Sequence, residues 1–306
     1  MATFAHLNKV LKAFRQPSKA IRFILPKVRN FFSIETVRFW YYYRKCRKPK
    51  IWHGVSDNDP QIREEIEKQL TESSFKLLDY HTSADGYREY MGRARYPMYS
   101  NYPERNQFNK TLQHYLAGEL LDLSADDTFI DIASDISPAP DIYHRLYGCR
   151  SYRQDLIFPD GVHGDTIGGD AGHMPVQDGF ATKMALHCAF EMFEQDSDIR
   201  FIKEANRVLA KGGKLCIVPL YLFTSYAIQT NPVTAIRSCM AFESDATLYC
   251  KKGWWRYARY YDIPHLADRI RENLGDLELT IYILRNGKVV DPTCWIRFFA
   301  LFQKVK

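Results

Sequence analysis

Three carboxylates stand where consecutive strand-like segments of the sequence end. Asp131 ends the first segment, Asp155 lies at the end of the second, and Asp170 follows in the next loop. In a doubly wound α/β sheet the ligand binds beyond the carboxyl ends of the strands, so acids at these positions face one site. An acidic residue after the second strand commonly holds ribose hydroxyls. Any one of these acids alone could be a solvated loop residue, and their order is what predicts a site.

Three histidines near the same edge could act as a general base. His187 ends a further strand-like segment, while His163 and His173 lie in the preceding loop. Histidine is the side chain most often used for proton transfer, although His187 could equally line a cofactor pocket. His163 stands between Asp160 and Asp165, but this stretch lacks the tight spacing of a metal site, so no metal is expected.

Alternating strands and helices must position these residues, and this alternation predicts a parallel, doubly wound sheet. The turn at Asn286-Gly287 predicts two closing antiparallel strands. The fold class is therefore α/β, Rossmann-like, with a helical basic segment in front. The expected strands are Thr128–Ile132, Ser151–Leu156, Ala181–His187, Lys214–Leu220, Leu277–Leu284 and Cys294–Lys304, and the expected helices between them are Pro140–Tyr147 and Ile199–Ala210.

Less regular segments surround this alternation. Asp59-Pro60 predicts a capped helix over Gln61–Leu70, helical spacing resumes over Phe108–Leu123, and Tyr80–Pro103 and Phe158–Gly179 are expected to be loops. These features divide the chain into three predicted parts with one insertion. The parts are a basic arm (1–58), a helical or lid segment (59–107) and the main domain (108–306), with an aromatic-rich cap inserted at 221–261.

Charge is distributed unevenly between the arm and the body. The whole chain carries +6, whereas residues 1–50 hold thirteen Lys and Arg against the single acid Glu35. Basic residues interleaved with aromatics suit an anionic membrane surface, nucleic acid, or packing of an apolar helix face on the body. Seven cysteines without a CxxC pair favour a reducing cytosol. No apolar run of about 18 residues is present, so the expected location is the cytoplasm, or the inner face of a membrane as a peripheral protein.

Two longer motifs point to a family. Gly169–Phe180 reads GDAGHMPVQDGF, and Ile202–Leu215 reads IKEANRVLAKGGKL. Their order and spacing resemble class I S-adenosylmethionine (SAM) methyltransferases, in which a GDA..LPF.D segment precedes a helix ending in RVLKPGG. The resemblance covers about Phe108 to Leu220. It implies a Rossmann-like fold, methyltransferase activity and SAM as the cofactor.

The resemblance also assigns cofactor contacts. Asp170 corresponds to the carboxylate that contacts the adenine amino group, with the Ala171 backbone and the Met174 side chain beside the base. The family's first motif, D.G.G.G, is read here from Asp131 with Ala133, Asp135 and Ser137 in the glycine positions. Glycines there let the backbone approach a cofactor closely. Ala133, Ser134 and Asp135 are thus the expected loop contacts, and Asp135 either repels the cofactor's carboxylate or pairs with its ammonium or sulfonium.

Three functions follow from these features. The leading hypothesis is a SAM-dependent methyltransferase that O-methylates a glycan, a glycolipid or another membrane-associated small acceptor. A non-catalytic methyltransferase-like scaffold at a membrane is the second, because the first motif lacks its glycines. An RNA methyltransferase is the third, but the N/D-P-P-Y/F signature is absent after His187, which makes nucleic acid the less favoured partner.

Overall fold

The computed structural model describes residues 59–98, 104–231, 234–235, 238, 240–250 and 256–306. The basic arm (1–58), together with the membrane contact expected of residues 1–50, lies outside the described residues. The chain divides into two compact units, and Ala227–Ala258, inside the predicted cap, belong to a different unit from Trp52–Tyr226 and Arg259–Lys306. Each unit is described by itself.

The larger unit is built on an eight-stranded sheet with the strand order β1-β10-β11-β6-β5-β2-β3-β4. β11 is antiparallel to β10 and β6, and the other neighbours pair in parallel, except that β4 also pairs in the opposite direction with the end of β3 at Val162 and His163. The order reverses between β2 and β5, which is the switch point of a doubly wound sheet. The strands are β1 (Lys76–Tyr80), β2 (Thr128–Ile132), β3 (Arg150–His163), β4 (Thr166–Gly168), β5 (Ala181–His187), β6 (Leu209–Val218), β10 (Leu277–Leu284) and β11 (Phe298–Lys304).

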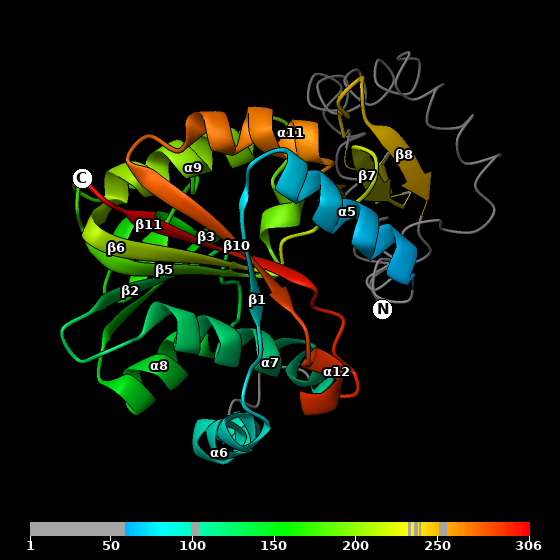
Figure 1. The fold of residues 1–306 in the computed structure, drawn as a ribbon. Helices are drawn as coiled ribbons and strands as arrows, with labels where there is room; N and C mark the ends of the chain where they lie inside the picture. Colours follow the sequence, from blue (N-terminus) through cyan, green and yellow to red (C-terminus); the bar gives the residue numbers. More distant parts are fainter. Residues whose placement is uncertain (1–58, 99–103, 232–233, 236–237, 239, 251–255) are drawn as a thin grey trace, which may run out of the picture. The chain divides into compact units, whose positions relative to one another are not determined.

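Helices cover both faces of this sheet. Figure 1 shows α7 and α8 on one face and α9 and α11 on the other. The α-helices of the larger unit are α5 (Pro60–Glu72), α6 (Ala84–Ala94), α7 (Glu104–Leu121), α8 (Ala139–Tyr147), α9 (Ser197–Val208), α11 (Ile263–Arg269) and α12 (Gly287–Val290), and its short 3-10 turns are η1 (Tyr96–Met98), η2 (Phe190–Met192) and η3 (Arg271–Asn273). The predicted Rossmann-like α/β fold with closing antiparallel strands is therefore confirmed.

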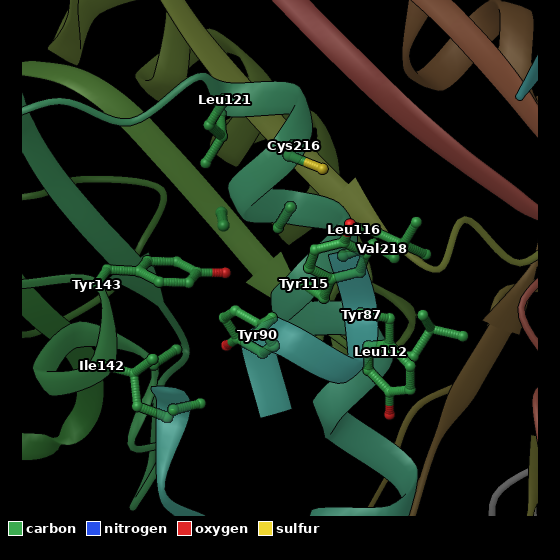
Figure 2. Close-up of a cluster of buried hydrophobic side chains, with 14 of the residues drawn as sticks. Tyr87, Tyr90, Leu112, Tyr115, Leu116, Leu121, Ile142, Tyr143, Cys216 and Val218 are labelled. Atoms are coloured by element: carbon green, nitrogen blue, oxygen red, sulfur yellow. The ribbon is translucent and has the colours of Figure 1, made fainter. Parts of the chain in front are cut away.

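Local sequence explains why these helices form and how they pack. The Asp59 carboxylate caps α5 by accepting from the backbone N–H of Gln61 at 3.1 Å, as expected of an Asp-Pro start. On the α7–α8 face, large side chains from α6, α7 and α8 pack against β6, each contributing about 1.5–3 kcal/mol on burial. Figure 2 labels the main members of this cluster: Tyr87, Tyr90, Leu112, Tyr115, Leu116, Leu121, Ile142, Tyr143, Cys216 and Val218.

Two predicted loops are wrong in part. Within Tyr80–Pro103 the chain forms α6, capped by the Ser83 hydroxyl, because Tyr87, Tyr90 and Ala94 make a buried stripe at helical spacing. Within Phe158–Gly179 the chain extends β3 to His163, turns, and returns as β4. The closing strands are joined through α12 rather than by a tight hairpin turn at Asn286-Gly287.

The smaller unit contains a further strand pair inside the predicted cap. β7 (Ala227–Thr230) pairs in parallel with β8 (Thr247–Cys250), and β9 (Ala258–Tyr260) begins where the chain leaves this unit. Within the part of the chain that the structure describes, no helix is long and apolar enough to cross a membrane.

Candidate functional site

The candidate site lies at the carboxyl ends of β2, β3 and β5, where the strand order reverses. The loop after β2 begins at Ala133, Asp155 lies within β3, and Asp170 follows β4. Asp155 therefore does not end its strand, as the sequence predicted, but lies where β3 pairs with Gly168 of β4, and Gly169 joins it to the segment that carries Asp170. Such an edge exposes backbone N–H groups and loop side chains to a ligand.

The loop after β2 has the backbone shape of a glycine loop without the glycines. Ala133 has φ 51° and Asp135 has φ 47°, both in the left-handed region. Three hydrogen bonds hold the loop: the N–H groups of Ala133 and Ser134 donate to Oε1 (3.3 Å) and the backbone O (3.0 Å) of Gln154, and that of Asp135 donates to Asp155 Oδ2 (2.8 Å). This conformation costs a residue with a Cβ about 1–2 kcal/mol, and it costs Asp less than Ala.

Replacing Ala133 with glycine should therefore stabilise the protein. Relief of left-handed strain outweighs the extra entropy of a glycine in the unfolded chain, and we expect the free energy of unfolding to rise by about 0.5–1 kcal/mol. Thermal unfolding followed by circular dichroism measures this change. Ala84→Gly, at the start of α6 and equally half-buried, is the control and should destabilise the protein. Equal losses in both variants would show that Ala133 carries no strain.

The two outer carboxylates are already engaged by the chain itself. Asp155 Oδ1 accepts from the backbone N–H of Ile157 at 3.1 Å, in addition to its contact with the β2 loop. Asp170 accepts from the N–H of Gly172 at 2.8 Å and pairs with Arg200 at 2.5 Å. Burial raises the pKa of Asp170, but the hydrogen bonds from Arg200 and from the Gly172 N–H, together with the charge of Arg200, outweigh it and hold this pKa below its usual value. Asp170 is therefore ionised and remains half-exposed.

Helix α9 holds the segment that contains Ala171 and Met174. Both residues are buried, and the Met174 N–H donates to Glu204 Oε1 at 2.6 Å. Arg207 donates to the Met174 carbonyl at 3.0 Å and pairs with Glu204 at 2.6 Å. Hydrogen bonding to Glu204 raises the pKa of Arg207, so this cation stays charged. Glu204 and Arg207 of the second motif thus hold the GDA segment in place. The sequence alone did not reveal these contacts.

His187 and Asp131 are buried together at the switch point. His187 Nδ1 lies 2.8 Å from Asp131 Oδ1, and its Nε2 lies 3.3 Å from the Tyr143 hydroxyl. His187 is 5% exposed and Asp131 is 1% exposed. Both ring nitrogens of His187 are therefore engaged within the protein. Asp131 Oδ2 and Ser134 Oγ are buried without a hydrogen-bond partner among the described residues.

The other two predicted histidines lie apart from this pair. His163 is exposed at the tip of the β3–β4 hairpin, and its Nε2 contacts the Asp160 carbonyl at 2.9 Å. His173 is exposed in the loop after β4, with its backbone N–H on the Asp170 carbonyl. No described hydrogen bond joins either ring to His187 or Asp131. Among the described residues, no group of three or more His, Cys, Asp or Glu is arranged to hold a metal ion.

A second polar group lies beyond β5, on the other side of the switch point. Cys188 has φ 53° and its thiol contacts Glu191 Oε1 at 3.1 Å and the Tyr221 hydroxyl at 3.3 Å. Burial, aided by Glu191, raises the pKa of Cys188 to about 12, so the thiol stays protonated at neutral pH. Tyr221 in turn stacks on Trp295 at a centroid distance of 5.9 Å.

Sequence reasoning missed several residues of this region. Lys110 and His114 of α7 approach His187: the Lys110 ammonium donates to the His187 carbonyl, and the two imidazole rings lie 4.6 Å apart. Tyr143 of α8 and Arg200 of α9 were missed as well. Helical periodicity could have identified the buried faces of α7 and α8, but not which side chains meet.

No protein-family model and no curated protein matches this chain. Solved structures do match. One is the 1,6-didemethyltoxoflavin-N1-methyltransferase of Burkholderia thailandensis, with 11% identity and a TM-score of 0.45 over 72% of this chain and 90% of that one. Another is the geranyl diphosphate C-methyltransferase of Streptomyces coelicolor A3(2), with 13% identity and a TM-score of 0.38 over 64% and 79%. A third is a SAM-dependent methyltransferase from Aquifex aeolicus, with 8% identity and a TM-score of 0.39 over 69% and 97%.

TM-scores below 0.5 are too low to carry an argument about this chain, so its classification rests on the strand order itself. From β2 onward the strands follow the doubly wound pattern, with one antiparallel strand inserted near the edge. By that order the chain has the Rossmann-like fold that its resemblance to the class I SAM-dependent methyltransferases implies.

Proposed function

We propose that the chain is a SAM-dependent methyltransferase that binds its cofactor across the ends of β2, β3 and β4. The observation that carries this proposal is the β2 loop, where Ala133 and Asp135 adopt the left-handed conformation of the glycines they replace. The backbone shape required for close approach to a cofactor is therefore present, although the glycines are not. Asp155 follows within β3, beside β4, and Asp170 follows after β4.

The residues at this edge fit such a cofactor. Asp131 Oδ2 and Ser134 Oγ are buried polar atoms with no hydrogen-bond partner in the described part of the chain, and such atoms favour a ligand that supplies a donor or a cation. Leu156 and Ile157, directly after Asp155, are 75% and 62% exposed. Neighbouring apolar side chains at the rim of a polar site suit the flat face of a purine base.

In this proposal each residue has a separate task. SAM supplies an electrophilic methyl group on a sulfonium. Asp155 accepts from ribose hydroxyls and Asp170 from the adenine amino group, because each carboxylate keeps lone pairs beyond those that the chain uses. Ala171 and Met174 pack beside the base, and Asp131, Ala133, Ser134 and Asp135 surround the amino acid part. Methyl transfer then gains mainly from positioning.

The acceptor belongs on the far side of the switch point, next to Cys188, Glu191 and Tyr221. A small molecule is the acceptor class that we propose. A hydroxyl on a glycan or glycolipid is the finer proposal, supported by the stacked Tyr221 and Trp295, since aromatic faces suit sugars. Its membrane association rests on the charge of residues 1–50 alone. His163, His173 and His187 stay candidate bases, of which His187 lies nearest to this side.

Isothermal titration with SAM and with S-adenosylhomocysteine (SAH) tests the proposal. We expect micromolar binding of both, and Asp170→Ala should weaken it about tenfold or more, because a hydrogen bond to a charged group is lost. Asp196→Ala is the matched control, since Asp196 also pairs with Arg200, at 3.3 Å, but is not at a strand end. It should leave affinity within about twofold. Wild-type protein that binds neither compound would instead support the scaffold alternative.

A further inference from the structure

Two buried histidines, one of which contacts Asp131, lie against each other. The ring of His114 in α7 meets the ring of His187 edge to face, at a centroid distance of 4.6 Å and an angle of 79°. His114 is fully buried, and its Nδ1 lies 2.8 Å from the Tyr96 hydroxyl. Burial, followed by the charges of His187 and Lys110, lowers the pKa of His114 well below its usual value. His114 is therefore the neutral member of this ring pair.

The hydrogen bonds of Tyr143 determine how many protons the Asp131–His187 pair holds. A phenol has one proton, and the Tyr143 hydroxyl donates it to the His114 carbonyl at 2.5 Å, because a carbonyl can only accept. The contact of 3.3 Å between Tyr143 and His187 is a hydrogen bond only if His187 Nε2 carries a proton. The contact of 2.8 Å between His187 Nδ1 and Asp131 needs a second proton. His187 and Asp131 together thus hold two protons and carry no net charge.

The surroundings leave this pair as the group that can change charge. Lys110 and His114 of α7 and Tyr143 of α8 contact His187 directly. Beyond them, Tyr96 of η1 contacts His114, Tyr90 of α6 contacts Tyr96, Cys216 of β6 acts electrostatically on Tyr143, and Cys188 follows His187 in the chain. Burial raises the pKa of Tyr143 and of both thiols, so these groups stay neutral. Within the described part of the chain, Asp131 is the carboxylate that contacts His187, and its Oδ2 has no hydrogen-bond partner there.

We propose that the Asp131–His187 pair gives up one proton when a cation binds beside Asp131, which couples cofactor binding to proton release. The inference rests on the proposed function, which places SAM at this loop. Loss of one proton leaves the pair with a charge of −1, and a sulfonium stabilises that form. SAH is neutral at sulfur and gives no such stabilisation. The pair therefore distinguishes the cofactor from its demethylated product by charge.

The same coupling balances the protons of the reaction. Transfer to an acceptor X–H forms an X–CH₃ bond, leaves the electron pair of the broken C–S bond on sulfur, and frees one proton. The positive charge beside Asp131 disappears in that step, so the pair can again hold two protons. Proton uptake by the pair thus accompanies formation of the product complex.

Proton-linked calorimetry tests this inference with SAM and SAH as the probes. Titrations at neutral pH in phosphate and in Tris, two buffers with different ionisation enthalpies, give the number of protons released. We expect SAM to release up to about one proton and SAH close to none. Because proton release favours binding at higher pH, the affinity for SAM should rise with pH by up to about tenfold per pH unit, while that for SAH stays level. The two compounds share their amino and carboxyl groups, so the difference isolates the sulfonium.

Variants separate the pair from other titrating groups. His187→Gln should abolish the proton release specific to SAM, whereas His81→Gln, at an exposed position, should leave it intact. Tyr143→Phe keeps the buried ring but removes the partner of Nε2, so the pH-dependent range for SAM should move to lower pH. Equal proton counts for SAM and SAH in wild-type protein would overturn the inference and leave the proposed function standing. Absence of binding by either compound would overturn both.

Discussion

Replacing Asp198 with asparagine should lower the free energy of unfolding by about 3–5 kcal/mol. Asp198 lies in the first turn of α9 and is fully buried. Its carboxylate pairs with Arg259 at 2.6 Å and with Arg269 at 2.6 Å, and accepts from the Tyr261 hydroxyl at 2.6 Å. One carboxylate therefore compensates two guanidinium groups, of which Arg259 is also fully buried. The amide would remove the negative charge that both cations share in a region of low dielectric constant.

Thermal and urea unfolding of the full chain measure this loss. Asp196→Asn is the matched control, because Asp196 lies two residues earlier, is exposed, and pairs with Arg200 on the surface. We expect that control to cost less than about 1 kcal/mol. Similar losses in the two variants would mean that the Asp198 cluster contributes no more than a surface ion pair.

This cluster was not predictable from sequence, although most of the sheet was. Thr128–Ile132 and Ala181–His187 were predicted with their observed bounds, because each is a run of mostly apolar residues that the sheet buries. The extension of β3 to His163 was missed, since Leu156–His163 is largely exposed and includes a proline and a glycine. Asp198 itself reads as an ordinary acid in a first helical turn, and only its tertiary contacts with β9 and α11 reveal its burial.

The candidate site was likewise predictable only in part. The place of Asp131 near the end of β2 was predictable, because strand ends follow from the alternation of elements, whereas Asp155 was predicted to end a strand that in fact continues to His163. The left-handed conformation of Ala133 and Asp135 was not, since residue type disfavours it and contacts with Gln154 and Asp155 impose it. The pairing of Asp131 with His187, 56 residues apart, depends on which strands become neighbours. Local sequence does not determine which strands become neighbours.

Gly168→Ala should have the other large effect, at the hairpin that precedes Asp170. A Cβ on Gly168 would lie 1.8 Å from the Pro159 carbonyl oxygen and 2.7 Å from that of Phe158. Both obstacles are backbone atoms of β3, so neither can rotate away. We expect a loss of about 3 kcal/mol in the free energy of unfolding, as for severe overpacking. Under the proposed function SAH binding should weaken as well, because Gly169 donates to the Asp155 carbonyl at 3.3 Å and accepts from Gln154 at 2.6 Å.

Gly164→Ala in the same hairpin separates crowding from backbone strain. Gly164 has φ +65°, but no atom lies within 4 Å of the position that its Cβ would take. That variant should lower the free energy of unfolding by only about 1 kcal/mol, which is the cost of placing Ala in the left-handed conformation. It should leave SAH affinity unchanged in calorimetry. If Gly168→Ala proved no more costly than Gly164→Ala, the β3 strand would have to yield at Pro159 without disturbing Asp155. The hairpin would then not be the element that fixes the two carboxylates relative to each other.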